Sequence, residues 1–273
     1  MKRATPHSTE SQPGPSWIVN ADDFGMNESV NAAIVQAFHE GWIDSASIMP
    51  NQEGFEHACE LTLPARLAGR LGVHITLDDG EPLSLPIRSC HRFCDAAGRF
   101  HTRRLRRAWR LSASERNVLL QEIICQIQTC QAAGIDPMHL DSHHHYHTSW
   151  PVGDVVIEAA QRCRVSMVRI NGNLSASSSM ATRAFKHFYN RRLRHANLAR
   201  SDEMGSVPNL LSRRMRLRGV IEVAVHPVPG PGGQLWDAEA NRPLADVVSS
   251  LIPDRLERVA ADKGPSAAKV SRW

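Results

Sequence analysis

The most unusual stretch of this sequence is HLDSHHHYH, which spans His139 to His147. Five of its nine residues are histidines, and an aspartate stands among them. Imidazole is the commonest protein ligand for divalent metals at neutral pH, and a carboxylate is its usual oxygen-donor companion. The alternatives to a metal site are a purification tag or a His-rich surface loop without a function. Because the run is internal and follows apolar residues, it favours a metal site.

The sequence does not decide whether this stretch is a strand or a helical turn. In an extended strand His143 and His145 would face one side and His144 the other, whereas in a helical turn His143 and His147 would share a face. His145 or His147 could therefore replace His143 as a ligand. Either geometry supplies two or three ligands at most, so the remaining ligands must come from elsewhere in the chain.

Polar residues capable of binding a metal also stand within or at the ends of other apolar runs. Asp22 and Asp23 follow the run 17–21, His74 lies in the run 71–77, and His226 lies near the end of the run 220–227. Short apolar runs of this kind indicate buried strands. Helical spacing and helix start or stop signals predict helices over 28–41, 53–67, 114–133, 151–162 and 183–198. A further helix, interrupted by a proline, is predicted over 237–251. Further strands are predicted at 45–49 and 167–171.

This alternation of strands and helices predicts an α/β fold with parallel strands and right-handed crossovers. The C-terminal ends of parallel strands meet at one rim, where such folds place their active sites. Because the polar residues come from several strands and not from one switch point, we expect barrel-like closure. We expect one domain over residues 17–252, a flexible leader over 1–16 and a polar tail over 253–273.

Composition narrows the classes of function. The chain has 273 residues, 42% of them hydrophobic and 22% charged, with a net charge of +4. Basic residues cluster over 88–110 and 183–218, but no nucleic-acid motif accompanies them, so no nucleic-acid partner is expected. Six cysteines without a Cys-x-x-Cys pair, no signal peptide and no membrane-length apolar run predict a soluble cytoplasmic protein.

These residue types are suited to metal-assisted hydrolysis. A catalytic divalent metal typically takes three protein ligands, and it polarises a carbonyl and lowers the pKa of water. One Asp and two His supply such a set, and the other of the two adjacent Asp residues could act as general base. His226 could protonate a departing amine or could be a core histidine. Arg169 could pair with Asp22 or Asp141 and keep it ionised.

Four motifs of this sequence, taken together, resemble the YdjC-like carbohydrate deacetylases, a family that includes chitooligosaccharide deacetylase. They are Ile18–Gly25, Gly72–Leu77 with Gly80–Ser84, His139–His147 and Glu222–Pro227, in that order. The resemblance covers about residues 17 to 251. It implies a deformed TIM-like (β/α) barrel and metal-dependent removal of acetyl groups from N-acetylated sugars or oligosaccharides.

Carried over position by position, the resemblance implies Asp23, His74 and His143 as ligands of one divalent metal ion, magnesium or zinc. It implies Asp22 as the general base and His226 as the acid. Weaker candidates for substrate-binding or supporting roles are Asp141, His145 and Arg169. A homodimer is left open.

Two other functions remain as hypotheses from the sequence. The first is a metal-dependent hydrolase of an ester or a phosphoester, although phosphoryl transfer commonly uses paired metals. The second is a non-catalytic sugar- or anion-binding protein of the same fold. The presence of Asp22 favours an enzyme, because binding alone does not require a general base.

Overall fold

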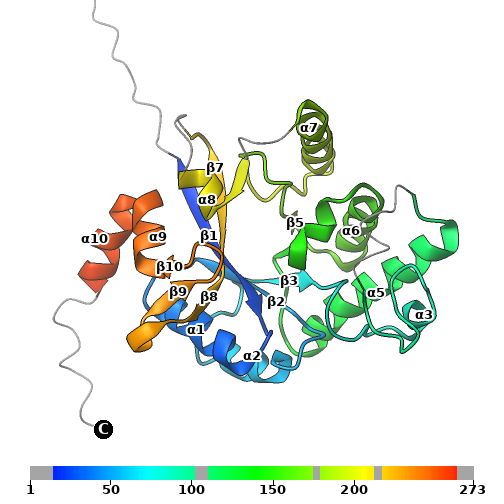
Figure 1. Cartoon of the computed structure of the whole chain (residues 1–273), viewed down its shortest axis with the longest axis horizontal. Coiled ribbons are helices and arrows are strands. Elements are labelled where there is room, and N and C mark those ends of the chain that lie inside the picture. The colour runs from blue at the N-terminus through cyan, green and yellow to red at the C-terminus, as the bar shows by residue number, and fades with distance from the viewer. Residues whose placement is uncertain (1–14, 102–109, 175–178, 212–216, 263–273) are drawn as a thin grey trace, which may run out of the picture.

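The structure is a computed structural model that describes residues 15–101, 110–174, 179–211 and 217–262 (Figure 1). Its strands are β1 (Ser16–Phe24), β2 (Ser45–Ile48), β3 (Leu71–Ile75), β4 (His139–Ser142), β5 (Met167–Val168), β6 (Glu203–Ser206), β7 (Val220–Val225), β8 (Pro227–Pro229), β9 (Leu235–Asp237) and β10 (Arg242–Pro243). Its α-helices are α1 (Glu28–His39), α2 (Phe55–Thr62), α3 (Leu85–Arg88), α5 (Ala113–Ala132), α6 (Trp150–Cys163), α7 (Met180–His195), α8 (Val207–Leu211), α9 (Leu244–Leu251) and α10 (Pro253–Asp262). Two 3-10 helices are η1 (His143–Thr148) and η2 (Pro231–Gly233).

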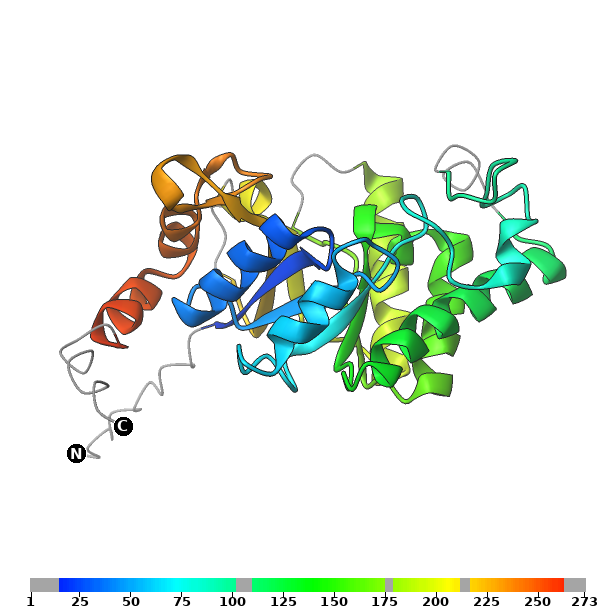
Figure 2. The same ribbon diagram turned by 90° about the horizontal axis from the view of Figure 1, so that it is seen from below.

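Seven parallel strands form one curled sheet in the order β5-β4-β3-β2-β1-β7-β6. The two ends of the sheet approach each other, because Val168 of β5 forms a bridge with Ala199, just before β6. Figures 1 and 2 show helices on the outside of this sheet, with α9 and α10 at one end and α3 and α5 at the other. The prediction of a single-domain α/β fold with a deformed TIM-like barrel is confirmed.

The interior of the curled sheet is polar, as β1 illustrates. Val19 and Ala21 belong to the hydrophobic core, whereas Asn20 and Asp22 contact other polar side chains. Successive strand residues point to opposite faces, so the apolar residues pack against helices and the polar ones point into the barrel. These inward side chains are almost fully buried and reach the functional site at one rim.

The segment between β7 and α9 differs from the prediction. We expected a helix over 237–251, but β8, β9 and β10 form a separate antiparallel sheet, and the helix begins only at Leu244. Pro243 is the last residue of β10 and the residue immediately before α9, so it does not interrupt a longer helix. It has no N–H to donate, which suits this position before the first helical turn. Gly230 allows a close approach by the ring of Trp236 on the neighbouring strand, where a Cβ atom would collide with it.

Some other element boundaries agree with their sequence signals, whereas α2 covers Phe55–Thr62 where we expected a helix over 53–67. Helix α5 begins with a capping box, in which the Ser112 side chain accepts from the Glu115 amide and the Glu115 side chain accepts from the Ser112 amide. Gly134 follows α5 with a positive φ of 81°, as a helix stop requires. By contrast, β5 has two residues where we expected five, and α7 starts at Met180 and not at Arg183.

The described residues include only parts of the expected leader and tail. Residues 1–14 of the expected leader and 263–273 of the expected tail lie outside the described residues, as do residues 102–109 of the Arg-rich stretch. The first ten residues of the expected tail form α10, whose Arg255 bonds to Asp44 and to the Gly41 carbonyl. Among the described helices, none combines the length and apolarity needed to cross a membrane.

Candidate active site and metal centre

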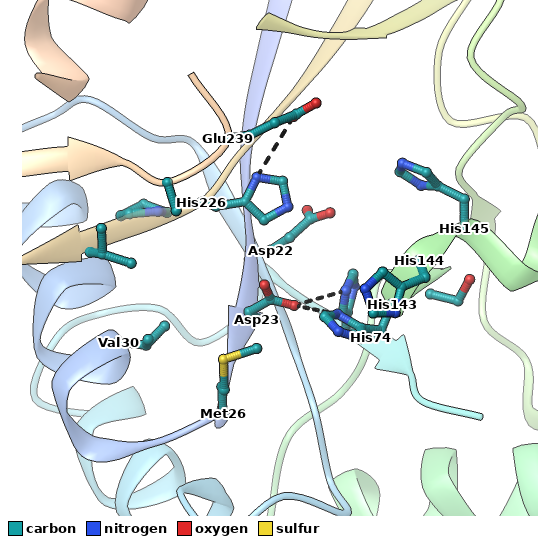
Figure 3. Close-up of a pocket in the computed structure, with 14 residues that line it drawn as sticks. Asp22, Asp23, Met26, Val30, His74, His143, His144, His145, His226 and Glu239 are labelled. Carbon is teal, nitrogen blue, oxygen red and sulfur yellow. Dashed lines mark hydrogen bonds and ion pairs between the residues drawn. The ribbon is translucent and has the colours of Figure 1, made fainter. Parts of the chain in front are cut away.

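Asp22 and Asp23 both border one cavity although they are neighbours on a strand. The pairing of β1 with β2 gains one residue between Ala21 and Phe24, and Asp23 within this bulge has a φ of 69°. Aspartate tolerates the left-handed region better than most residues because its short side chain can bond locally. A bulge re-aims side chains. The two carboxylates therefore escape the alternation of a regular strand and face the same space (Figure 3).

The histidine run adopts neither of the two geometries considered from sequence. Strand β4 ends at Ser142, and His144 and His145 then take φ values of 49° and 59° inside η1. Because of this left-handed backbone at His144 and His145, the imidazoles of the run point in different directions. His143 bonds to Asp23, His144 bonds to Asp78, and the Nδ1 atom of buried His147 lies 2.7 Å from the Ser142 hydroxyl. His145 lines the cavity without joining the group around Asp23.

Three side chains from three strand ends converge at the rim. The Asp23 Oδ1 atom lies 2.9 Å from His143 Nδ1 and 3.2 Å from His74 Nε2. The candidate ligand atoms of Asp23, His74 and His143 all lie within 4.8 Å of one another. One carboxylate and two imidazoles at this spacing could hold a divalent metal ion with room for a further ligand. The donor set therefore fits the cation that the sequence implied.

A buried carboxylate, Asp141, orients His74. Its Nδ1 atom lies 2.8 Å from Asp141 Oδ1, so its Nε2 atom points towards Asp23. Such a carboxylate partner fixes the ring and increases its basicity as a ligand. Burial alone would lower the pKa of His74. The charge of Asp141, together with hydrogen bonds from the His74 ring to Asp141 and Asp23, raises that pKa to about 10 in the absence of a metal.

Asp22 is held by a buried arginine. Arg169 donates to both oxygens of Asp22 at 2.7 Å, contacts Asp141 at 2.8 Å through one terminal nitrogen, and donates from Nε to Glu222 at 2.7 Å. Burial works to raise the pKa of Asp22, but the Arg169 guanidinium outweighs it and lowers that pKa well below its usual value. Asp22 is therefore a carboxylate at neutral pH, held in one orientation beside Asp23.

The other side of the cavity is formed by the loop after β7. His226 lines it, and its backbone N–H donates to buried Asp237 at 2.7 Å. The His226 Nδ1 atom accepts or donates no hydrogen bond within the described chain and lies 4.0 Å from a Glu239 oxygen (Figure 3). The cavity has a volume of about 570 Å³, which lies within the range of small-molecule sites.

The structure brings most of the predicted residues to this one place. Six of them line the cavity: Asp22, Asp23, His74, His143, His145 and His226. Asp141 and Arg169 are fully buried behind them. His139 is also buried, and its ring lies against Gly72, where a Cβ atom would collide with it, so it serves packing.

Sequence reasoning missed Glu222, Arg200 and Glu239. Glu222 bonds to both Arg169 and Arg200, and Glu222 and the two arginines are all buried. A lone charge inside the apolar run 220–225 was the signal that could have revealed Glu222. Arg200 and Glu239 stand in irregular segments with no local signal. A second trio, Asp78, His143 and His144, also has the spacing of a metal site, but it shares His143 with the first.

Known proteins resemble this chain in sequence and in fold. A family described as YdjC-like protein matches residues 16–233. The carbohydrate deacetylase of Brevibacillus brevis is 38% identical over 148 residues, which cover 54% of this chain and 56% of that protein. The chitooligosaccharide deacetylase of Proteus mirabilis is 33% identical over 169 residues, 60% of this chain and 62% of that protein. The chain thus matches these curated relatives over little more than half of their length.

A crystal structure of a protein from Enterococcus faecalis V583 superposes with a TM-score of 0.65 and 22% identity. The match covers 90% of this chain and 95% of the other. At this identity the likeness concerns the fold alone.

Proposed function

This chain belongs to the YdjC-like protein family, and from that membership we propose that it is a hydrolase that removes acetyl groups from N-acetylated sugars or oligosaccharides. Relatives described as carbohydrate deacetylase and chitooligosaccharide deacetylase support the reaction class. The observation that carries the proposal is the grouping of Asp23, His74 and His143 beside Asp22 on one cavity wall.

We propose Asp23, His74 and His143 as the ligands of one divalent cation. When bound, such a cation would polarise the acetamide carbonyl and make water more acidic. Magnesium and zinc are the candidates, and two imidazoles in a set of three favour zinc, since magnesium prefers oxygen ligands. Asp141 would keep the His74 ring oriented towards the cation.

The remaining steps follow from the side chains of this chain. Asp22 is ionised and oriented by Arg169. It accepts a proton from a water molecule while the oxygen of that water attacks the acetyl carbon. The C–N bond then breaks, and His226 donates a proton to the nitrogen. The products are acetate and a free amino sugar. A Glu239 oxygen lies 4.0 Å from the Nδ1 atom of His226.

The test is acetate release by the purified protein from N-acetylglucosamine, N,N′-diacetylchitobiose and a broader panel of N-acetylated sugars. We expect release after zinc or magnesium is added and none after treatment with a chelator. A full panel without metal-dependent acetate release would contradict the proposal. Parallel assays with ester and phosphoester substrates, and sugar binding without turnover, separate the two alternative functions named from sequence.

We further propose that the protein works in the cytoplasm. All six cysteines lie in the described part of the chain, and each is a free thiol. Free thiols are typical of a reducing compartment.

A further inference from the structure

A second group of possible metal ligands borders the candidate active site. It consists of Asp78, His143 and His144, which each offer one ligand atom within 4.8 Å of the other two. The rings of His143 and His144 have their centroids 4.0 Å apart, and Figure 3 shows them side by side next to His74. We call Asp78, His143 and His144 the outer trio, and Asp23, His74 and His143 the inner trio.

The Asp78 carboxylate is buried, unlike a typical surface charge. Its side chain is only 1% exposed. One of its oxygens, Oδ2, lies 2.7 Å from His144 Nδ1. The other oxygen, Oδ1, is buried and accepts no hydrogen bond from any residue that the structure describes. A buried oxygen without a partner is costly, and a bound cation would supply the missing partner.

The outer trio is open to solvent on the side of His144. The His144 side chain is 53% exposed, and it lines the same cavity as Asp22 and Asp23. A cation can therefore reach the outer trio through the mouth of the active site. Two imidazoles and one carboxylate are a donor set that suits zinc better than magnesium.

The two trios cannot both be complete, because they share His143. A neutral imidazole has one nitrogen with a free lone pair and therefore binds one cation. While the inner trio holds its cation through His143, the outer trio has only Asp78 and His144 to offer. The outer trio should therefore bind more weakly and fill only when the cation is in excess.

We propose that the outer trio is an inhibitory second metal site that takes up zinc when zinc is in excess. The cation binds to Asp78 and His144 and takes His143 as its third ligand. The inner trio is then left with Asp23 and His74, so the catalytic cation loses one of its three ligands. The inhibitory part of this inference rests on the proposed deacetylase function, whereas the existence of the site does not.

The first measurement is the number of zinc ions bound by the metal-stripped protein, from equilibrium dialysis followed by atomic emission. For the wild type we expect one tightly bound zinc and a second that binds about 10- to 100-fold more weakly, the usual effect of a lost supporting contact at a metal site. Asp78→Asn and His144→Asn should lose the second zinc and keep the first. Asparagine suits position 144 because it tolerates the positive φ found there.

A matched control and a folding check accompany these variants. His187→Asn removes an exposed histidine of α7 and should leave both zinc ions bound. Thermal unfolding identifies a variant that fails to fold. His144 is half exposed, so its variant should fold even if the change at buried Asp78 is not tolerated.

The second measurement is acetate release at increasing zinc concentration, from the N-acetylated sugar that is most active in the panel above. Wild-type activity should rise to a maximum and then fall by about tenfold or more at high zinc. In Asp78→Asn and His144→Asn it should rise to a plateau and stay there. His187→Asn should behave like the wild type.

The outcomes separate this inference from the proposed function. If the wild type binds a single zinc, or if both variants retain the second zinc, the outer trio is not a metal site. If the variants lose the second zinc but excess zinc does not inhibit the wild type, the inhibitory role is wrong. If no sugar releases acetate, the proposed function and the inhibitory role fail together, and the zinc count alone decides whether the site exists.

Discussion

Asp22 and Asp23 are adjacent in the chain but differ in every partner. Asp22 bonds to Arg169, and Asp23 bonds to His74 and His143. The proposed base and the proposed ligand can therefore be tested separately. We expect Asp22→Asn to lower kcat by about 10²- to 10⁴-fold while metal content stays at the wild-type level. We expect Asp23→Asn, which also tolerates a positive φ, to lose the metal.

Acetate assays and metal analysis by atomic emission on the same purified samples check this division. Wild-type turnover in Asp22→Asn would remove Asp22 from the mechanism. Undiminished metal content in Asp23→Asn would remove Asp23 from the ligand set.

His74 makes metal binding depend on pH. In the metal-free protein its pKa is raised to about 10, so near pH 7 its ring carries a proton that a metal must displace. Apparent metal affinity should therefore rise by about tenfold for each pH unit between pH 6 and 9. The rise should level off above the pKa. Calorimetry in two buffers of different ionisation enthalpy should show about one proton released for each metal bound at pH 7. An affinity that is flat over this range would contradict the assignment.

At the scale of single elements, local sequence chemistry explains helix α5 particularly well. Ser112 and Glu115 form a reciprocal capping box, and Gln126 within the helix bonds to the backbone of Thr76 just after β3. The same helix also holds the segment between β3 and α3, because Glu122 accepts from the amides of Leu83 and Ser84. The start of α5 was predictable because capping depends on residues three positions apart. Its contacts with the loop were not.

Ser112→Ala should lower the free energy of unfolding by about 1 kcal/mol, because it removes the acceptor of the Glu115 amide. Urea denaturation followed by circular dichroism measures this change. Ser250→Ala, at an exposed position inside α9, is the control and should change stability by less than about 0.5 kcal/mol. Equal effects from the two substitutions would show that the cap contributes nothing particular.

At the scale of the whole molecule, the C-terminal helix is tied to the beginning of the barrel. Arg255 of α10 donates to both carboxylate oxygens of Asp44, at 2.8 and 3.1 Å, and to the Gly41 carbonyl at 2.8 Å. Asp44 also accepts from the Val19 amide of β1. Only 9% of the Arg255 side chain is exposed, although 37% of the Asp44 side chain is, so the guanidinium is shielded from solvent more than it would be in a surface ion pair.

Arg255→Ala should destabilise the protein by about 1.5 to 3 kcal/mol, since it removes charge-assisted bonds to Asp44 and to the Gly41 carbonyl, both in the segment between α1 and β2 that is distant in sequence. Arg162→Ala is the matched control, because it breaks an exposed pair with Glu158 within one helix and should cost less than about 0.5 kcal/mol. Both are measured by urea denaturation. A similar small loss for both would mean that α10 does not stabilise the barrel.

The buried charges of the barrel interior are another property of the whole molecule. Asp22, Asp141 and Glu222 surround Arg169, and Arg200 approaches the same Glu222. Removing one member of such a buried network leaves an uncompensated charge. The residues behind the site therefore depend on one another for charge compensation.

The amino-acid sequence by itself determined the order of most strands and helices as far as β7, though not β6 or the antiparallel sheet β8–β10. It also placed Asp22, Asp23, His74, His143 and His226 at or near strand ends. Local signals suffice there, because apolar runs, capping residues and turn residues act over a few positions. Parallel strands then bring their C-terminal ends to one rim by geometry alone.

Only the tertiary structure decided how those side chains point. The bulge at Asp23 and the left-handed backbone at His144 and His145 select one imidazole of the run to face Asp23. The pairing of Arg169 with Asp22, Asp141 and Glu222 joins four segments spread over two hundred positions. Local backbone preferences differ by about 1 kcal/mol or less between such alternatives, so burial and ion pairing contributed by distant segments make the choice.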